Sequence, residues 1–342
     1  MRVPFASFLI RQWFLVTMAI VLSMGILGGI VLPADSLKRW TGWLSPRAIT
    51  GLVLFLMSAT LDGRRLWKAA AVSPSPALLG IFVNVVAAPL LAWGMSRTQS
   101  AADFEIGLLI AGSVPCTLAT AAVWTRKAGG NDAAALVVTL ATNAACFLTT
   151  PFWLELTTGR EVPIDANEMG LQLLLCAVLP MAFGQLVRLL PRGIDFVARR
   201  QRTAGFLAQV LVLLMVFLAA LDSGKRIAST GRGPSLAPFL WVWASCAMIH
   251  LALLAISLLG SRILRHSPRD AIAAALSGSQ KTLPIGLVLA TDPRLFAHPD
   301  LLGAGQPASF VLFPMILYQT SQLIIDTWLV GRIGLGVQDS RD

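Results

Sequence analysis

The chain has 342 residues, of which 56% are apolar and 13% charged, and its mean hydropathy is +0.73. Soluble domains contain about 25% charged residues, so this composition excludes a water-soluble globular protein and indicates an all-α polytopic membrane protein in contact with a lipid bilayer. The formal net charge of +10 does not indicate a nucleic-acid partner. Its lysines and arginines gather in the short connections between apolar runs, where they favour membrane topology.

Long apolar runs follow one another along the chain. About 20 residues span the hydrocarbon core as a helix, so these runs predict about ten transmembrane helices. The last two are counted as spans although they contain Lys281 and Asp326. In chain order, the expected helices cover Gln12–Pro33, Ala48–Leu61, Ala69–Ser96, Ile106–Thr125, Ala133–Leu154, Met169–Val187, Thr203–Leu221, Gly233–Ser261, Ala271–Thr291 and Leu301–Gly331.

The distribution of basic residues predicts the orientation. With the N-terminus inside, the inner connections carry more lysine and arginine than the outer ones, and the largest cluster lies between Arg188 and Arg202. The positive-inside rule therefore favours cytoplasmic N- and C-termini, and the short loops suit a cell inner (plasma) membrane. The four cysteines fall inside apolar runs, where cysteine behaves as a small hydrophobe. Without a CxxC or Cys/His cluster, we expect no disulfide, metal site or cofactor.

Two of the apolar runs are interrupted by polar, proline-containing stretches, at Ser113–Thr117 and Ser277–Pro284. Proline cannot continue a helix, because it lacks the N–H and its ring clashes with the preceding turn. Irregular backbone at bilayer depth is tolerated only where protein or a water-filled cavity satisfies it. Paired interruptions in the two halves of a chain indicate the binding site of a transporter.

The two halves of the chain share a weak internal similarity. Phe55–Asp62 is similar to Phe217–Asp222, and both interruptions contain Thr-Leu. These pairs fall at corresponding helices, the second with the seventh and the fourth with the ninth. Five helices per half is an odd number, so the second half must enter the membrane in the opposite sense, as an inverted repeat. We place the boundary so that residues 1–160 form the first repeat and residues 161–342 the second.

Polar side chains near the interruptions are the candidate ligands. Broken helices expose N–H groups that attract anions and C=O groups that coordinate cations. Hydroxyl and amide oxygens suit Na⁺ or a hydrogen-bonded anion, although serine and threonine in membrane helices often bond their own i−4 carbonyl instead. The expected substrate-binding residues are Pro115, Thr117, Thr120, Asn143, Lys281 and Thr282. The expected ion-binding residues are Asn84, Asn131, Thr139, Ser277, Ser279 and Gln280.

Lys281 requires a compensating partner, because a lysine near the centre of a membrane costs roughly 2.5–3.5 kcal/mol on insertion scales. Three roles are open to it: binding an anionic substrate, replacing a coupling cation as a fixed charge, or capping a half-helix. Asp326 is interpreted as an interfacial residue, with a counter-charge for Lys281 as the alternative. His250 is interpreted as a hydrogen-bonded structural histidine without an evident partner.

Several motifs resemble the bile acid:sodium symporter superfamily, specifically its SBF-like branch. The resemblance covers nearly the whole chain. Its most specific parts are Lys127-Ala-Gly-Gly-Asn131 and Ser279-Gln280-Lys281-Thr282-Leu283. Further similarity lies at Arg11–Phe14, Phe55–Ser58, Asn84 with Pro89 and Trp93, Pro115–Thr117, Thr149–Pro151 and Pro314–Gln322.

This resemblance implies two inverted five-helix repeats, with helices 4 and 9 unwound and crossing. It implies a panel domain of helices 1, 2, 6 and 7 and a core domain of helices 3–5 and 8–10. Organic anions are the typical substrates, and Na⁺ drives the best-known members. Leu276 stands where sodium-driven members have a glutamate and Ala135 where they have a serine, and the asparagine expected around Thr120–Ala122 is absent. Asn84, Thr139 and Gln280 match.

We therefore expect a secondary-active transporter for a small organic anion that works by alternating access, with Na⁺ as a candidate coupling ion. A proton-coupled or uncoupled carrier and a non-transporting membrane receptor or regulator on the same fold are the alternatives. An intramembrane enzyme is not expected, because the sequence has no HExxH motif and no paired intramembrane acids. A channel is disfavoured because no ring-forming charge pattern is evident.

Overall fold

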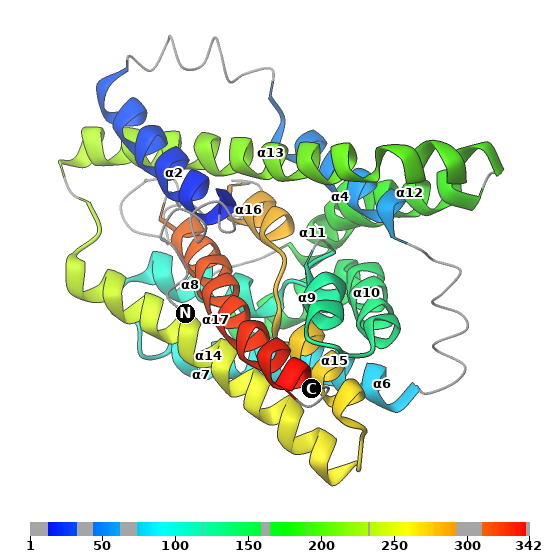
Figure 1. The fold of residues 1–342 in the computed structure, drawn as a ribbon. Coiled ribbons are helices and arrows are strands. Elements are labelled where there is room, and N and C mark those ends of the chain that lie inside the picture. Colours follow the sequence, from blue (N-terminus) through cyan, green and yellow to red (C-terminus); the bar gives the residue numbers. More distant parts are fainter. Residues whose placement is uncertain are drawn as a thin grey trace.

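The computed structural model describes residues 13–32, 44–61, 74–118, 120–158, 165–189, 191–231, 233–291 and 310–339. All regular elements within these ranges are helices (Figure 1). Seven of them are long and apolar enough to cross a membrane: Trp13–Val31, Pro74–Ser96, Asp132–Thr158, Ala166–Arg188, Arg199–Ser229, Leu236–Ile263 and Pro268–Thr291. The apolar helix Pro46–Thr60 is shorter. The chain is thus a multi-pass membrane protein.

One group of helices is built on α13 (Pro191–Thr230), the longest helix in the described ranges. Helices α2 (Trp13–Val31), α4 (Pro46–Thr60) and α12 (Leu179–Leu189) pack on α13. The group also includes η2 (Leu174–Val178) and α11 (Ala166–Leu173), which precede α12 in the chain, and α11 packs on α10 (Asp132–Thr158) as well. Both α2 and α4 lie against α13 (Figure 1). Gly29 of α2 faces the backbone of Gly224 so closely that a Cβ atom on Gly29 would lie 2.9 Å from the Gly224 Cα atom. Small residues at such positions let two membrane helices approach backbone to backbone.

The other group surrounds α15. It consists of α6 (Pro74–Phe82), η1 (Val83–Ala87), α7 (Ala88–Ser96), α8 (Ala102–Ser113), α9 (Ala121–Lys127), α10 (Asp132–Thr158), α14 (Leu236–Ile263), α15 (Pro268–Ser279), α16 (Leu283–Thr291) and α17 (Leu312–Asp339). Helices α6, α10 and α14 pack on α15, and residues 273–290 are all buried. The second interrupted segment is therefore enclosed by protein.

Both predicted interruptions are confirmed. Helix α8 ends at Ser113, and Val114 has an extended backbone with φ −69° and ψ 154° before α9 begins at Ala121. Helix α15 ends at Ser279, and Gln280 is extended with φ −77° and ψ 143° before α16 begins at Leu283. The second interruption is shorter than expected, because residues 277–279 remain helical.

Two π-helical turns were not predicted. Each contains the residue four positions before a proline: Val85 precedes Pro89 in this way, and Cys176 precedes Pro180. A proline ring clashes with the carbonyl of residue i−4 in an α-helix, and the wider π turn moves this carbonyl away. The turn at Val83–Ala87 also sets the position of Asn84, which is important for the site below.

The helix boundaries agree with the sequence-based expectations in most cases, but α17 continues to Asp339, beyond the expected end at Gly331, and α13 differs at both ends. Helix α13 has 40 residues and extends beyond both ends of the expected span Thr203–Leu221. At roughly 1.5 Å per residue, it is longer than a bilayer crossing requires, and its polar ends continue as helix instead of forming loops. The expected repeat boundary at residues 160 and 161 lies outside the described residues.

Candidate functional site

The two interruptions meet and are hydrogen bonded to each other. The backbone N–H of Thr282 donates to the carbonyl of Pro115 at 2.9 Å, and the side chain of Lys281 donates to the carbonyl of Val114, also at 2.9 Å. The last carbonyls of a helix have no partner within the helix. The second interruption thus supplies donors for the end of the first half-helix.

Lys281 is almost fully buried, with 2% of its surface exposed. Besides Val114, its Nζ atom contacts the backbone oxygen of Asn84 at 2.7 Å and the side-chain oxygen of Asn84 at 3.4 Å. All three oxygens belong to neutral groups, and none of the carboxylates in the described ranges forms an ion pair with Lys281. A carbonyl-rich helix end carries a partial negative charge, so these neutral oxygens can stabilise the ammonium group.

The backbone of Lys281 is fixed from α17. Its N–H donates to Oε1 of Gln322 at 2.9 Å, and its carbonyl accepts from Nε2 of Gln322 at 3.0 Å. The same Nε2 atom donates to Oε1 of Gln319 at 2.7 Å. Gln322 therefore gives the backbone N–H and C=O of Lys281 the hydrogen bonds that they lack because the helix is interrupted.

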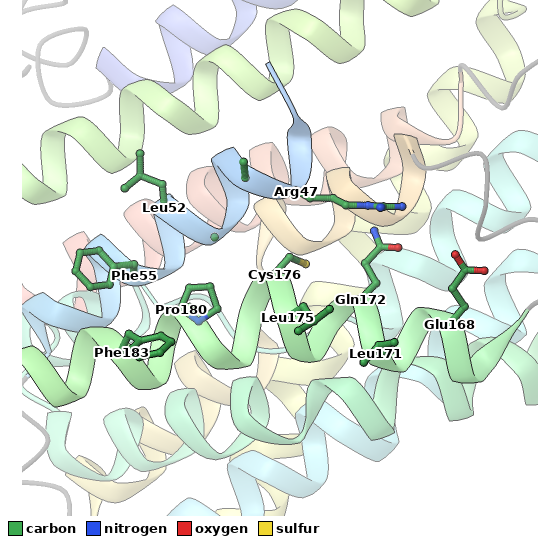
Figure 2. Close-up of a pocket in the computed structure, with 12 residues that line it drawn as sticks. Arg47, Leu52, Phe55, Glu168, Leu171, Gln172, Leu175, Cys176, Pro180 and Phe183 are labelled. Carbon is green, nitrogen blue, oxygen red and sulfur yellow. The ribbon is translucent and has the colours of Figure 1, made fainter. Parts of the chain in front are cut away.

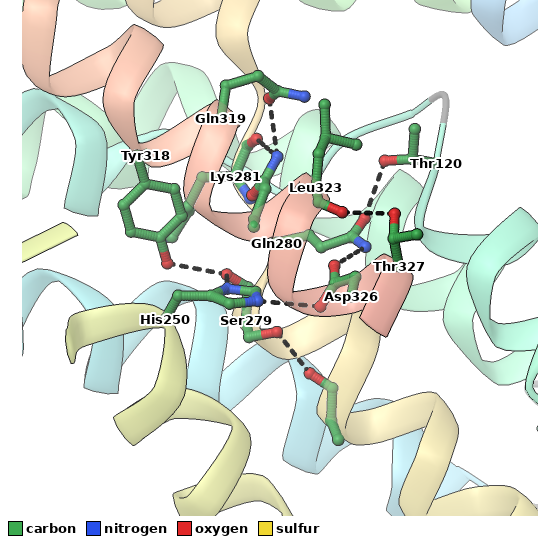
Figure 3. A network of polar contacts seen from close by, with 12 residues as sticks. Thr120, His250, Ser279, Gln280, Lys281, Tyr318, Gln319, Leu323, Asp326 and Thr327 are labelled. Carbon is green, nitrogen blue, oxygen red and sulfur yellow. Dashed lines mark hydrogen bonds and ion pairs between the residues drawn. The ribbon is translucent and has the colours of Figure 1, made fainter. Parts of the chain in front are cut away.

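Gln280 connects two separate parts of the site (Figure 3). Its Nε2 atom donates to Oδ2 of Asp326 at 2.6 Å, and its Oε1 atom accepts from the hydroxyl of Thr120 at 3.0 Å. Oδ1 of Asp326 lies 2.9 Å from Nε2 of His250. Gln280, Asp326 and His250 are each 0% exposed. The interpretation of Asp326 as an interfacial residue is therefore wrong, and its partners are Gln280 and His250 instead of Lys281.

Both ring nitrogens of His250 have a partner. Nδ1 of His250 lies 3.3 Å from the carbonyl oxygen of Ser279, while Nε2 contacts Asp326. Tyr318 donates to the same Ser279 carbonyl at 2.9 Å. The His250–Asp326 pair is therefore buried against the second interruption, at Ser279 and Gln280.

The other predicted residues have mainly structural contacts. The Asn84 amide donates to the carbonyls of Gly278 at 3.1 Å and Gln280 at 2.9 Å, and Asn143 donates to that of Cys116 at 2.7 Å. The hydroxyls of Thr139, Ser277 and Ser279 each donate to the carbonyl four residues earlier. Asn131 lies apart from the interruptions, where it donates to Asp270 at 2.8 Å and accepts from the N–H of Ala134.

A cavity of about 270 Å³ lies between the two helix groups. Trp13 of α2, Met57 of α4 and Gln209 of α13 line one wall. The opposite wall is formed by both interruptions and by α9 and α17, with Thr117, Thr120, Thr282, Lys127 and Gln319 among its residues. Lys281 does not line this cavity. Three of the predicted substrate residues, Thr117, Thr120 and Thr282, thus line the cavity, whereas Pro115 and Asn143 do not.

A larger hollow of about 690 Å³ lies between α4 and α11–α12. Leu52, Phe55 and Leu175 are among its apolar side chains, and Arg47 and Glu168 lie at one end (Figure 2). None of the predicted site residues lines it. Volume alone would favour this hollow as the ligand-binding site. The backbone groups of the two interruptions can bind a ligand, however, and they open onto the smaller cavity.

The sequence profile of the SBF-like CPA transporter family matches residues 12–334. The chain belongs to the SBF-like CPA transporter family. This confirms the resemblance seen in the sequence motifs, and it identifies the protein as a transporter and not an enzyme.

Individual relatives have low sequence identity. A probable sodium/metabolite cotransporter BASS4, chloroplastic, of Arabidopsis thaliana is 27% identical over 238 residues, which is 67% of this chain and 52% of that protein. Sodium/bile acid cotransporter 7 of Rattus norvegicus is 23% identical over 229 residues, 66% of this chain and 64% of that protein. The match spans less than two thirds of the length of both relatives.

Sequence reasoning on this SBF-like protein missed several site residues. His250 and Asp326 are separated by 76 positions, and no motif links them. Gln322 and Gln319 were part of the tenth-helix similarity but had no assigned role. Lys127 belonged to a recognised motif without being considered as a cavity residue. Polar side chains in apolar runs were the available signal for His250, Asp326, Gln319 and Gln322. Lys127 follows the end of such a run and had no such signal.

Proposed function

We propose that this protein is a secondary-active transporter that moves a small organic anion by alternating access. The cavity between the two helix groups carries this proposal, because its walls combine the interrupted helices with residues from the facing group. Substrate sites of inverted-repeat transporters lie at such a position. The names of the two relatives, a metabolite cotransporter and a bile acid cotransporter, agree with an organic solute as the substrate.

The proposed moving parts are the two helix groups. The panel domain would be α2, α4, α11, η2, α12 and α13, and the core domain would be α6–α10 with α14–α17. Both form parts of a ten-helix inverted repeat in this proposal. Rocking of one domain against the other would open the cavity to each side in turn. By the charge rule, the ends of α9 and α2 that line the cavity are cytoplasmic, so this conformation would be open inward, with both termini in the cytoplasm of a cell with an inner (plasma) membrane.

We propose further that transport does not depend on Na⁺. Asn84 and Gln280, which match sodium ligands of the family, are engaged by protein groups. The ammonium of Lys281 is bonded to the carbonyl of Asn84, and Leu276 adds no carboxylate to the site. The residues present therefore do not fit a sodium ion, and Lys281 would act as a built-in cation.

Two measurements test the proposed function. Thermal stability of the detergent-purified protein is first compared in Na⁺, K⁺ and choline salts at equal ionic strength, because a ligand that binds the folded state raises stability. We expect no specific effect of Na⁺, and a saturable increase with Na⁺ would contradict the built-in cation. Anions that stabilise the protein are then tested for uptake into proteoliposomes. Stabilisation without uptake at any imposed ion gradient would favour a receptor over a transporter.

A further inference from the structure

The cavity between the helix groups has several hydrogen-bond donors without a partner in the described part of the chain. Lys127 of α9 lies over the ring of Trp124, with Nζ 4.7 Å from the ring centroid, and forms no described ion pair. Gln209 of α13 forms no described hydrogen bond. The side-chain oxygen of Gln319 of α17 accepts from Gln322, while its amide nitrogen has no described partner. These donors come from both walls and can serve a ligand.

The neighbouring charges are already paired, so they do not neutralise Lys127. Asp132, the nearest acid along the chain, is bound by Arg126 at 2.6 Å. Neither Asp nor Glu is among the described residues that line the cavity. Lys281, the cation that sequence reasoning favoured, donates to backbone carbonyls away from the cavity. The cavity therefore has one unpaired positive charge and several donors, which is the chemistry of an anion site.

The rest of the wall is apolar and aromatic. Trp13 and Phe14 of α2, together with Leu323 of α17, face the space beside these donors. Ligand pockets usually measure about 300–1,000 Å³, so a volume of about 270 Å³ suits a small ligand. A molecule with one anionic group and a flat apolar part fits these walls better than a multiply charged one.

We propose that Lys127 pairs with the anionic group of the substrate and that the amides of Gln209 and Gln319 complete its binding. This inference rests on the proposed transport function and specifies the charge recognition in it. The anion contacts α9 and α17 on one wall and α13 on the other. A bound substrate thereby bridges the two helix groups, and Lys127 selects a carboxylate or sulfonate over a neutral analogue.

The test uses three probes with the same ring: benzoate, benzenesulfonate and uncharged benzamide. The variants are Lys127→Gln and Lys127→Arg, and the matched control is Arg332→Gln, which removes another exposed cation that lies over a tryptophan ring, 5.5 Å from the centroid of Trp328, outside the cavity lining. Lys127 is exposed, so these variants should fold, and their thermal stability without ligand checks this. Binding is measured as ligand-dependent thermal stabilisation, and transport as benzenesulfonate uptake into proteoliposomes.

We expect the wild type to prefer the two anions to benzamide. Lys127→Gln should weaken anion binding by about tenfold or more, since charged hydrogen bonds contribute about 1.5–3 kcal/mol, while leaving benzamide binding unchanged. Lys127→Arg and Arg332→Gln should stay close to the wild type. If Lys127→Gln binds and moves benzenesulfonate like the wild type, this inference is wrong but transport stands. If the wild type neither prefers nor moves the anions, the inference and the proposed anion transport are both overturned.

Discussion

Asp103 of α8 and Arg226 of α13 form an ion pair, with Oδ2 and Nη1 2.8 Å apart and side chains 9% and 13% exposed. The guanidinium also lies 4.9 Å from the ring centroid of Phe310. The pair joins the two helix groups at the start of α8, whereas the cavity lies beyond the other end of this helix. In the proposed cycle it holds the outer side closed while the inner side is open.

Replacement of Asp103 by asparagine should weaken this link. We expect a loss of about 1.5–3 kcal/mol in the free energy of unfolding, because a largely buried charged hydrogen bond is removed. Accessibility of a cysteine introduced at Pro238, which lines the hollow beside the pair, should increase. Glu105→Gln is the control, since its pair with Arg97 is exposed and 3.8 Å long and should contribute less than about 1 kcal/mol. Unchanged cysteine accessibility in Asp103→Asn would show that the pair does not close this side.

Lys281→Ala should abolish uptake and lower thermal stability. The substitution leaves the carbonyls of Asn84 and Val114 without their donor, and unsatisfied buried polar groups cost about 1–3 kcal/mol each. Na⁺ can coordinate the vacated oxygens, so Na⁺ should stabilise the variant more than choline does. The wild type under the same salts is the control. Uptake at the wild-type level in Lys281→Ala would refute the role of the built-in cation.

The His250–Asp326 pair should contribute strongly to stability. Removal of one partner leaves the other buried alone, which costs about 3–5 kcal/mol, so His250→Gln and Asp326→Asn should each destabilise the protein by this order. Their effects should not add, because the residues are in direct contact. His266→Gln, which affects a part-buried histidine bonded to Ser75 at 2.7 Å, is the control. Additive losses in an equilibrium unfolding experiment would contradict a coupled pair.

Gly29→Ala should separate α2 from α13. Its new Cβ atom would lie 2.9 Å from the Gly224 Cα atom, and overpacking of this kind costs about 1–3 kcal/mol. Gly94→Ala in α7 is the matched control, because nothing lies within 4 Å of its Cβ position. At position 94, alanine should stabilise the helix, because its helix propensity is more favourable than that of glycine by about 1 kcal/mol. Opposite signs for the two alanines in a thermal unfolding assay are the expected result; destabilisation by both would point to a general effect of the mutation.

Local chemistry explains what the sequence could predict. Pro115 and Pro284 mark places where a helix loses its hydrogen bonds, and the interruptions are found beside them. A lysine in an apolar run demands partners, and Lys281 has them: the carbonyl of Asn84, which lies in a π turn, and the carbonyl of Val114 at the end of α8. The interruption at Ser277 was placed too early because α15 keeps its hydrogen bonds until Ser279.

Tertiary contacts explain what the sequence could not predict. The partnership of His250 with Asp326 depends on the packing of α14 against α17, and no spacing along the chain reveals it. Which residues line the cavity likewise depends on how the helices pack. Nothing in the local sequence therefore distinguished Lys127, which lines the cavity, from Arg126, which does not. Both lysines carry the same charge, yet only the three-dimensional contacts show that Lys281 is occupied and Lys127 is available.

The π-helical turn at Val83–Ala87 has a consequence for any comparison between related chains. A π turn holds one residue more than an α turn, so deleting one residue here would leave an ordinary α turn and bring a backbone carbonyl against the ring of Pro89. Asn84 would then leave the carbonyls of Gly278 and Gln280 and no longer offer its own to Lys281. Length changes are usually tolerated in loops and not inside spans. In this helix, a single gap in an alignment would thus indicate that the contact between Asn84 and Lys281 has changed.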